Sequence, residues 1–501
     1  MWRALGLSAL AVALACRSDD RAATGAAHVT ARKVTISNIA RADYVGPEVC
    51  GGCHADEFAR WSLSLHRMMN AKASDPGAVV GDFGGAAIEY RGEQARFTRD
   101  GSGYAMEIGA LHYRVTRTIG RRGLQEYVGV ADGSDVEVRL PFGWWPRAGG
   151  WAPQIAFDPW LAERDYDPAQ PVREPWAARC PWCHSTYPFA QRIARASAPE
   201  HLGHGMEQWF ESAAGSDVLA VGEQVTTGIS CESCHLGGRA HATGTGALHF
   251  VPQGASAAVT AANVPDEPFD AERKDARVVN AVCAQCHSGP SPRLADGTAL
   301  RNSSEAIDLA ASPCTGIKCT DCHDPHRADS RGDTARANAA CVACHEPLAD
   351  ALAAQVHAGD GHAGATCLDC HMPRIVMGID RFVRTHRISS PTNPDVLAKA
   401  EPNACNACHL DRGIDWTIAA LARGWSVRLD PSSWTRAYGA LDRPVGEVWL
   451  ASAQPALRVL AAELYGDALP DAARAQLQRD PLPFVRAWTA RAPARSSHRL
   501  Q

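Results

Sequence analysis

The segment Cys50-Gly51-Gly52-Cys53-His54 is a C-x-x-C-H motif, and the chain repeats this pattern seven more times. The eight copies use 16 of the 18 cysteines of the 501-residue chain. Any fold of this chain must therefore accommodate the motif along most of its length. The other seven copies are Cys180, Cys183 and His184; Cys231, Cys234 and His235; Cys283, Cys286 and His287; Cys319, Cys322 and His323; Cys341, Cys344 and His345; Cys367, Cys370 and His371; and Cys405, Cys408 and His409.

The spacing within the motif has a chemical reason. Two thiols three positions apart can reach the two vinyl groups of one haem, and the histidine that follows can bind the iron as its proximal ligand. Zinc ribbons also pair C-x-x-C units, but they do not require a histidine after every second cysteine. Because all eight copies carry this histidine, the sequence predicts eight covalent haem c groups.

The distance between motifs indicates the fold class. From residue 180 to residue 410 the motifs follow each other every 22 to 52 residues, which is too close for conventional domains between them. We therefore expect residues 45–410 to form a mainly α-helical and loop multihaem cytochrome domain whose apolar core consists largely of haem. Within it, residues 80–142 alternate apolar and polar positions between glycines, which predicts a small β-rich insertion of about six strands.

The segments outside the motif region differ in character. Residues 143–182 contain six tryptophans and several prolines, and we expect loops there that pack on the sheet or on haem. Residues 411–501 contain no motif but show helical periodicity, which predicts a short HEAT-like or TPR-like helical tail. One such unit cannot bury its own apolar face, so the tail should dock on the haem domain or on a partner.

The N-terminus has the pattern of an export signal. Arg3 precedes the apolar residues 4–15, and Ala13-Leu14-Ala15 fits a cleavage site, so residues 1–15 are predicted to be a signal peptide. Residues 16–44 have the composition of a tether, and Cys16 stands where a lipoprotein signal places its modified cysteine. We expect the protein in the periplasm or cell envelope, with a lipid anchor at Cys16 as one open alternative.

Charge and hydropathy narrow the range of partners. The net charge of −5 and the hydrophobic content of 46% are ordinary for a globular protein and do not indicate nucleic-acid binding. After residue 15, no stretch of 18 uncharged apolar residues predicts a membrane-spanning helix, so membrane association should be peripheral or through a lipid anchor. We therefore expect redox partner proteins or a quinol-linked membrane complex as partners.

Several stretches around the motifs share a further pattern, namely residues 44–48, Trp61, His66, and residues 319–326, 367–374 and 402–409. In these residues the chain resembles the multihaem c-type cytochromes related to the tetrahaem electron acceptor of hydroxylamine oxidoreductase. TPR or HEAT repeats follow the haems in many members of that family. The resemblance spans roughly residues 44–425. It implies electron transfer, and it implies distal iron ligation by His66 and His386.

The spacing of other histidines indicates further distal ligands. His326 follows the motif histidine His323 by only three residues, so both cannot bind one iron, and His326 should cap a neighbouring haem. The same argument applies to His241, six residues after His235. Between motifs lie two close pairs, His201 and His204, and His357 and His362. Either member of each pair could bind, and our candidates are His204 and His357.

Cys314 lies five residues ahead of a motif cysteine, and two interpretations of it stay open. It is either a buried free thiol or a thiolate axial ligand, and we expect the free thiol.

Two functions are compatible with this pattern. The first is an electron conduit whose haems all carry two histidine ligands. The alternative is an octahaem oxidoreductase, in which one open haem acts on nitrite, hydroxylamine, tetrathionate or a similar small nitrogen or sulfur species. Neither catalytic residues nor a substrate can be assigned from the sequence. Because few of the remaining histidines have favourable positions, we expect at least one haem without a distal histidine.

The first prediction concerns the cofactor count. Haem should stay with the denatured polypeptide during acid–acetone extraction, at eight haems per chain, because thioether bonds survive denaturation. Expression without the c-type haem maturation system should yield an unfolded chain, since the core would be missing. A count of six or fewer would contradict the motif interpretation.

Overall fold

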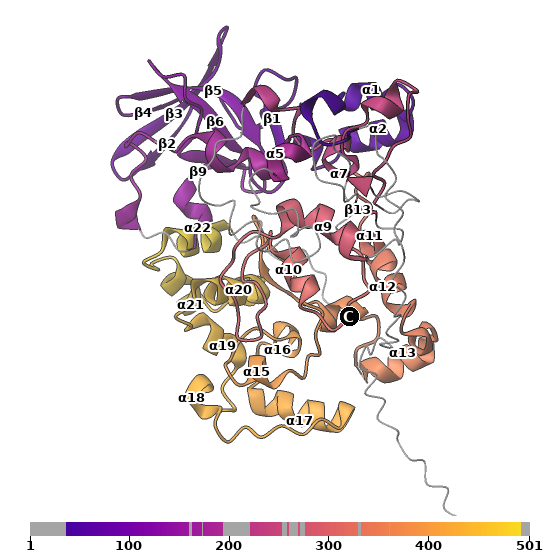
Figure 1. Ribbon diagram of the computed structural model, residues 1–501. Helices are drawn as coiled ribbons and strands as arrows, with labels where there is room; N and C mark the ends of the chain where they lie inside the picture. Colours follow the sequence, from indigo (N-terminus) through magenta and orange to yellow (C-terminus); the bar gives the residue numbers. More distant parts are fainter. Residues whose placement is uncertain are drawn as a thin grey trace, which may run out of the picture.

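The computed structural model describes residues 37–159, 163–172, 174–193, 221–252, 258–259, 269–270, 276–328, 332–359 and 361–491. The predicted signal peptide, Cys16, His201 and His204 lie outside these ranges. Among the described residues, no helix combines the length and the apolar character that crossing a membrane would need. Figure 1 shows the β-sheet at the top left, the yellow C-terminal helices directly below it, and the orange helices that precede them at the bottom, with much of the motif region on the right.

A seven-stranded antiparallel sheet forms the β-rich part. Its main path runs β2-β3-β4-β5-β6-β7, and β1 pairs with the far end of β5. The meander begins and ends within the predicted insertion, residues 80–142, and β1 joins it from outside. The strands are β1 (Asn70–Lys72), β2 (Ala86–Tyr90), β3 (Glu93–Asp100), β4 (Gly103–Ile108), β5 (Leu111–Ile119), β6 (Glu126–Ala131) and β7 (Val138–Arg139).

The alternation in these strands places one set of side chains in a core. Ala95 and Phe97 of β3 face Met106 and Ile108 of β4, and all four side chains are fully buried. Phe97 stacks on Trp151 with ring centroids 3.6 Å apart. Because successive residues of a strand point to opposite faces, these four side chains share one face of the sheet and form its core.

The tryptophan-rich segment differs from its prediction. Strands β8 (Phe142–Trp145) and β9 (Gly150–Pro153) form a hairpin where the sequence suggested loops. Trp144 and Trp151 pair across it, and a bridge from Gln125 to Trp144 joins the hairpin to the sheet. The many tryptophans and prolines obscured the strand pattern, but apolar pairs across a hairpin stabilise it well.

Short helices carry the motifs, which we number 1 to 8 in chain order. In motifs 1, 2, 5, 6 and 8 the histidine N–H donates to the carbonyl of the first cysteine at 2.9–3.2 Å, which is an α-helical turn. The helices before the tail are α1 (Pro47–Gly51), α2 (Ala55–Ser62), α3 (Trp176–Arg179), α4 (Pro181–His184), α5 (Phe189–Ile193), α7 (Cys231–His235), α8 (Arg239–Ala242), α9 (Ala276–His287), α10 (Glu305–Ala310), α11 (Cys319–Cys322), α12 (Thr334–Val342), α13 (Ala351–Ala358), α14 (Cys367–His371), α15 (Pro394–Leu397) and α16 (Ala404–Cys408).

Small two-stranded sheets complete the motif region. They pair β10 (Ser185–Thr186) with β11 (Thr226–Thr227), β12 (Ala258–Val259) with β13 (Phe269–Asp270), and β14 (Arg374–Met377) with β15 (Phe382–Arg384).

Helices form the C-terminal tail. They are α17 (Ile414–Trp425), α18 (Thr435–Tyr438), α19 (Val445–Leu450), α20 (Pro455–Tyr465), α21 (Asp471–Leu477) and α22 (Pro483–Arg491). One hydrophobic core joins them to β14, β15 and the β8–β9 hairpin. Within it, Trp488 contacts Trp145 and Phe382 at ring-centroid distances of 6.2 and 5.7 Å. The tail therefore docks on the rest of the chain.

The second prediction tests this docking. Trp449 of α19 is fully buried, and its indole N–H donates to the Ala400 carbonyl at 2.8 Å. Trp449→Ala should cost about 3–5 kcal/mol of stability, because it leaves a large cavity. The control Trp449→Phe keeps most of the volume and should cost about 1–3 kcal/mol, since the carbonyl then lacks its donor. Urea unfolding of the haem-loaded protein measures both, and equal losses would contradict the packing argument.

Candidate functional site

Acidic and amide side chains build several motif turns. In motif 5, the Asp321 carboxylate accepts the Lys318 backbone N–H at 2.8 Å. In motif 7, Asp369 accepts the Thr366 N–H at 2.9 Å. In motif 8, Asn403 caps its helix by accepting the Asn406 N–H at 2.9 Å. These bonds satisfy donors that a helix start leaves free, so the residues between and before the cysteines hold the thiols in position.

No motif cysteine forms a disulfide within the described residues, which leaves these thiols for covalent haem attachment. Three hydrogen bonds join thiols of different motifs. They connect Cys50 with Cys231, Cys283 with Cys319, and Cys341 with Cys367. Each contact joins the first cysteines of two motifs. The chain thus packs its motifs against one another in pairs.

Five pairs of histidines face each other at nearly equal distances. Bonds of about 2 Å from a metal to two imidazole nitrogens on opposite sides put the ring centroids about 6 Å apart. The observed distances are 6.2 Å for His54 and His241, 6.3 Å for His235 and His326, 6.1 Å for His323 and His386, 6.1 Å for His357 and His371, and 6.4 Å for His362 and His409. Each pair combines one motif histidine with one histidine outside the motifs, so the residues fit an iron between them.

His66 lies near a sixth motif histidine, without a ring contact like those of the five pairs. Burial lowers the pKa of His66 to about 4, and the positive charge of His287 acts on it in the same direction. The His66 ring also donates a hydrogen bond to the backbone carbonyl of Pro325. His66 therefore lies beside the histidine of motif 4, although it follows motif 1 in the chain.

His287 has a charged hydrogen-bond partner. Its Nδ1 lies 3.2 Å from Glu305 Oε2 at the start of α10. Burial disfavours a charged imidazole, but the hydrogen bond and the charge of Glu305 outweigh it and raise the pKa of His287 to about 9. Burial would likewise raise the pKa of Glu305, but its contacts with His287 lower it to about 2.

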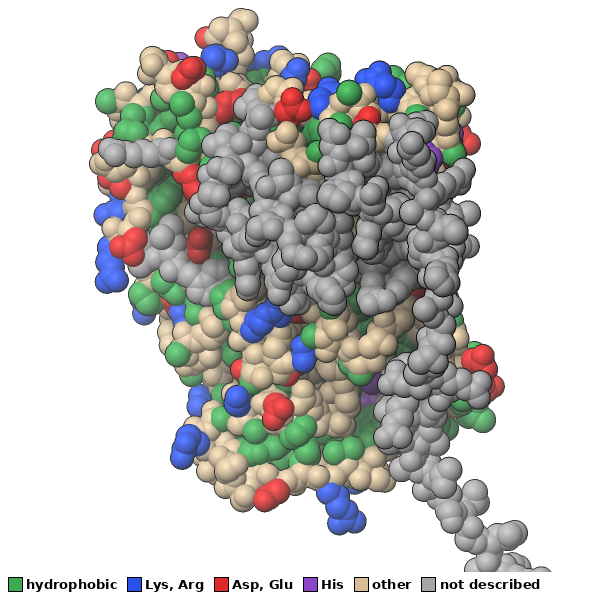
Figure 2. Space-filling view, viewed as in Figure 1, with side chains coloured by type: hydrophobic (Ala, Val, Ile, Leu, Met, Phe, Trp, Pro, Cys, Tyr) green, Lys and Arg blue, Asp and Glu red, His purple; other side chains and the backbone are tan. Residues whose placement is uncertain are grey.

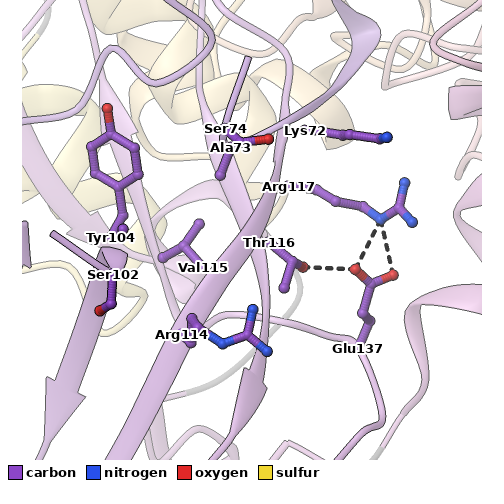
Figure 3. A pocket seen from close by; sticks show the side chains of 11 residues that line it. Lys72, Ala73, Ser74, Ser102, Tyr104, Arg114, Val115, Thr116, Arg117 and Glu137 are labelled. Atoms are coloured by element: carbon purple, nitrogen blue, oxygen red, sulfur yellow. Dashed lines mark hydrogen bonds and ion pairs between the residues drawn. The ribbon is translucent and has the colours of Figure 1, made fainter. Parts of the chain in front are cut away.

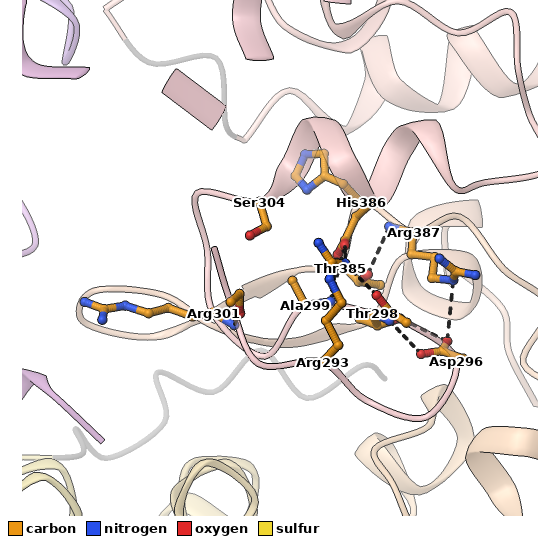
Figure 4. Close-up of polar contacts among 12 residues, drawn as sticks. Arg293, Asp296, Thr298, Ala299, Arg301, Ser304, Thr385, His386 and Arg387 are labelled. Carbon is orange, nitrogen blue, oxygen red and sulfur yellow. Dashed lines mark hydrogen bonds and ion pairs between the residues drawn. The ribbon is translucent and has the colours of Figure 1, made fainter. Parts of the chain in front are cut away.

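A polar network holds the loop around His386 (Figure 4). Arg293 donates to Asp308 at 2.9 Å, and Asp308 also accepts the Ala299 N–H at 3.1 Å. Ser312 donates to the His386 carbonyl at 3.3 Å and accepts the Ile388 N–H at 2.9 Å. The backbone on both sides of His386 is therefore fixed, which orients the imidazole toward His323.

Neutral groups orient two other motif histidines. His371 Nδ1 lies 2.9 Å from the Ser389 carbonyl oxygen, and His235 Nδ1 lies 3.4 Å from that of Phe250. Such a bond leaves Nε2 available for a metal and fixes the orientation of the ring.

Helix α13 and the segment after it supply two of the paired histidines, His357 in the last turn of the helix and His362 beyond it. The sequence left open whether His357 or His362 would bind, and the structure brings both to motif histidines. Trp425 of α17 supports this segment, because its indole N–H donates to the His357 carbonyl at 2.7 Å and its ring lies 6.1 Å from that of His362.

Apart from His287, which has only His66 nearby, two motif histidines lack a paired imidazole within the described ranges. His184 meets the edge of Trp176 at 5.8 Å, and burial lowers its pKa. For His345, no second imidazole lies at the pair distance in the part of the chain that the structure describes. Our candidate His204 lies outside that part. His112, in β5, contacts the exposed Asp132 at 2.9 Å and not a motif.

Sequence reasoning missed the carboxylates Glu305 and Glu232. Glu232, inside motif 3, is buried and accepts the N–H groups of Val45, Gly46 and Gly238 at 2.8–3.0 Å. It thereby ties motif 3 to the start of motif 1. Its place between two motif cysteines was the one available signal, and Glu305 had none.

A separate pocket of about 360 Å³ lies on the sheet, away from the motif cysteines (Figure 3). Lys72, Arg114 and Arg117 line it, and Arg117 pairs with Glu137 at 2.9 Å. Over the face shown in Figure 2, basic and acidic side chains are mixed, in keeping with the mild net charge.

Comparisons with known proteins bear on the motifs. The profile of the doubled CXXCH motif matches residues 312–350, which contain motifs 5 and 6. No curated protein matches the chain. The outer cell wall cytochrome OcwA is similar in structure, with 16% identity over 90% of this chain and 100% of that one and a TM-score of 0.42. The undecahaem cytochrome from the S-layer of Carboxydothermus ferrireducens has 15% identity over 88% of this chain and 70% of that one, with a TM-score of 0.39.

The motif match supports covalent c-type haem binding through CXXCH, and hence a multihaem c-type cytochrome. The relation to the electron acceptor of hydroxylamine oxidoreductase stays a prediction, as does the HEAT-like nature of the tail.

The third prediction tests the pairing of His326 with His235. His326→Ala should convert one low-spin haem to high spin and shift its potential, because the iron loses one of its two strong-field ligands. Absorption and EPR spectra of the ferric protein measure this. The control His112→Ala removes an exposed histidine and should leave the spectra unchanged. An unchanged spectrum for His326→Ala would show that His326 is no ligand.

Proposed function

We propose that the chain binds eight covalent haems and transfers electrons along them at the cell envelope. The observation that carries the proposal is the continuous contact between motifs. Bound haem iron supplies the Fe(III)/Fe(II) couple, while the cysteines and histidines fix where each iron lies.

The thiol contacts set the first links. Since the motif cysteines bind the edge of a haem, two thiols in contact bring two haem edges together. Motifs 1 and 3 meet through Cys50 and Cys231, and motifs 4 and 5 through Cys283 and Cys319. Cys341 does the same for motif 6 with motif 7.

Other contacts join these pairs into one series. Trp182 of motif 2 donates its indole N–H to the Gln285 carbonyl of motif 4 at 3.0 Å. His326, from the segment of motif 5, faces His235 of motif 3. Cys341 is close enough to Cys322 of motif 5 for their charges to interact.

Motif 8 completes the row, because Cys405 lies close enough to Cys370 for that thiol to help raise its pKa. All eight motifs are thus connected, which supports a conduit that spans the domain.

The histidine pairs support electron transfer over substrate chemistry. An iron held between two imidazoles has no free position for a substrate, and its geometry changes little between oxidation states. Five motif histidines have such a partner, and we propose His66, which lies near His287, as the partner in a sixth pair. We propose redox proteins or a quinol-linked membrane complex as partners, and export by residues 1–15 as the route to the envelope.

The fourth prediction tests the conduit by its electron count, and it tests the open haem that the octahaem oxidoreductase alternative requires. Reductive titration should take up eight electrons per chain, because every iron is a one-electron centre in contact with the series. In EPR of the ferric protein, six low-spin centres are expected from the six pairs. We also expect at least one high-spin signal, from motif 2 or motif 6, that cyanide converts to low spin.

The outcomes differ for the two functions. An uptake well below eight electrons would contradict the conduit. A wholly low-spin spectrum that cyanide leaves unchanged would contradict the open haem and remove the basis for the oxidoreductase alternative.

A further inference from the structure

Glu305 is held firmly at the edge of motif 4. Its Oε1 accepts the Ser303 N–H at 2.9 Å, and its Oε2 lies 3.2 Å from His287 Nδ1. Only 24% of its side chain is exposed. Because both oxygens have partners and α10 begins at this residue, the carboxylate has little freedom to leave the imidazole.

The charged groups that interact with the Glu305 carboxylate are mainly imidazoles. His287 and His386 are the charged groups that act most on it, and they belong to the histidine pairs of motifs 4 and 5. No arginine or lysine forms an ion pair with Glu305 within the described ranges. The carboxylate therefore interacts with two candidate iron ligands, and no arginine or lysine competes for it within the described ranges.

A carboxylate hydrogen-bond partner changes how strongly a histidine binds iron. A histidine that donates its Nδ1–H to a carboxylate gains electron density, which makes it a stronger ligand and stabilises the more positive ferric iron. The corresponding partners of His371 and His235 are neutral backbone carbonyls. Motif 4 is thus set apart from motifs 7 and 3 by the charge of this partner.

Asp324 offers a natural comparison. Its Oδ1 lies 3.4 Å from His326 Nδ1, but the same oxygen accepts the backbone N–H of His326 at 3.0 Å. Only that backbone bond meets hydrogen-bond geometry. Asp324 therefore places a similar charge near an axial histidine without a hydrogen bond to the ring.

We propose that the hydrogen bond from His287 to Glu305 lowers the reduction potential of the haem bound by motif 4. The proposal rests on the proposed function, in which motif 4 links motif 2 to the other motifs. Trp182 connects it to motif 2, and Cys283 connects it to motif 5. A haem of lowered potential in this link is reduced late, and it makes electron exchange between motif 2 and the other motifs an uphill step.

The fifth prediction tests Glu305 directly. Glu305→Gln keeps the size of the side chain but removes its charge. One haem should then titrate at a more positive potential, and the EPR g values of one low-spin centre should change, since the imidazole loses its anionic partner. Spectropotentiometry and EPR of the full-length, haem-loaded protein measure both. The matched control Asp324→Asn removes a charge near His326 and should give a smaller shift and no such change in g values.

Each outcome decides the proposal. Wild-type potentials and g values in Glu305→Gln, with eight haems bound, would overturn it while leaving the conduit intact. Equal shifts in both variants would also overturn it, because charge alone would then suffice.

Should Glu305→Gln lose haem, Glu305→Asp keeps the charge on a shorter side chain. An upward shift in that variant supports the hydrogen bond, and an unchanged potential overturns it. A count below eight in the wild type would instead defeat the proposed function.

Discussion

The geometry of the C-x-x-C-H turn constrains everything else in this chain. Two thiols on one helical turn, closed by the bond from the histidine N–H to the first cysteine carbonyl, present three groups to one planar cofactor. Eight such turns leave little chain for a conventional core between residues 180 and 410. Capping residues therefore stabilise these turns, as the backbone hydrogen bonds of longer helices do elsewhere. Examples are Asp321, Asp369 and Asn403.

Exchange of histidines between segments gives the motif region its long-range order. His66 follows motif 1 but lies beside His287 of motif 4, and His326 follows motif 5 but faces His235. Each such pair ties two distant stretches of backbone to one iron position. In our proposal, ligation and folding are therefore coupled, as metal binding and folding generally are when ligands come from separate segments.

The sequence predicted the motif turns and the sheet because both depend on local pattern. It could not decide between His357 and His362, since both lie between the same two motifs and only five residues apart. Trp425, from the tail, contacts both the His357 carbonyl and the His362 ring. The β8–β9 hairpin was wrongly expected to be loop, because its tryptophans show no simple alternation. Glu305 lies 18 residues from His287 in the chain, and only the fold of α9 against α10 brings them together.

The buried or partly buried carboxylates of this fold differ in the groups that compensate their negative charge. A carboxylate removed from water is costly unless donors surround it. Glu232 is fully supplied by three backbone N–H groups, and Asp308 by Arg293 and Ala299. Glu305 instead uses one oxygen for the backbone and directs the other to an imidazole. The negative charge of Glu305 is balanced by a candidate iron ligand. Any stabilisation that Glu305 gains therefore depends on the positive charge at that iron. This positive charge changes when an electron arrives.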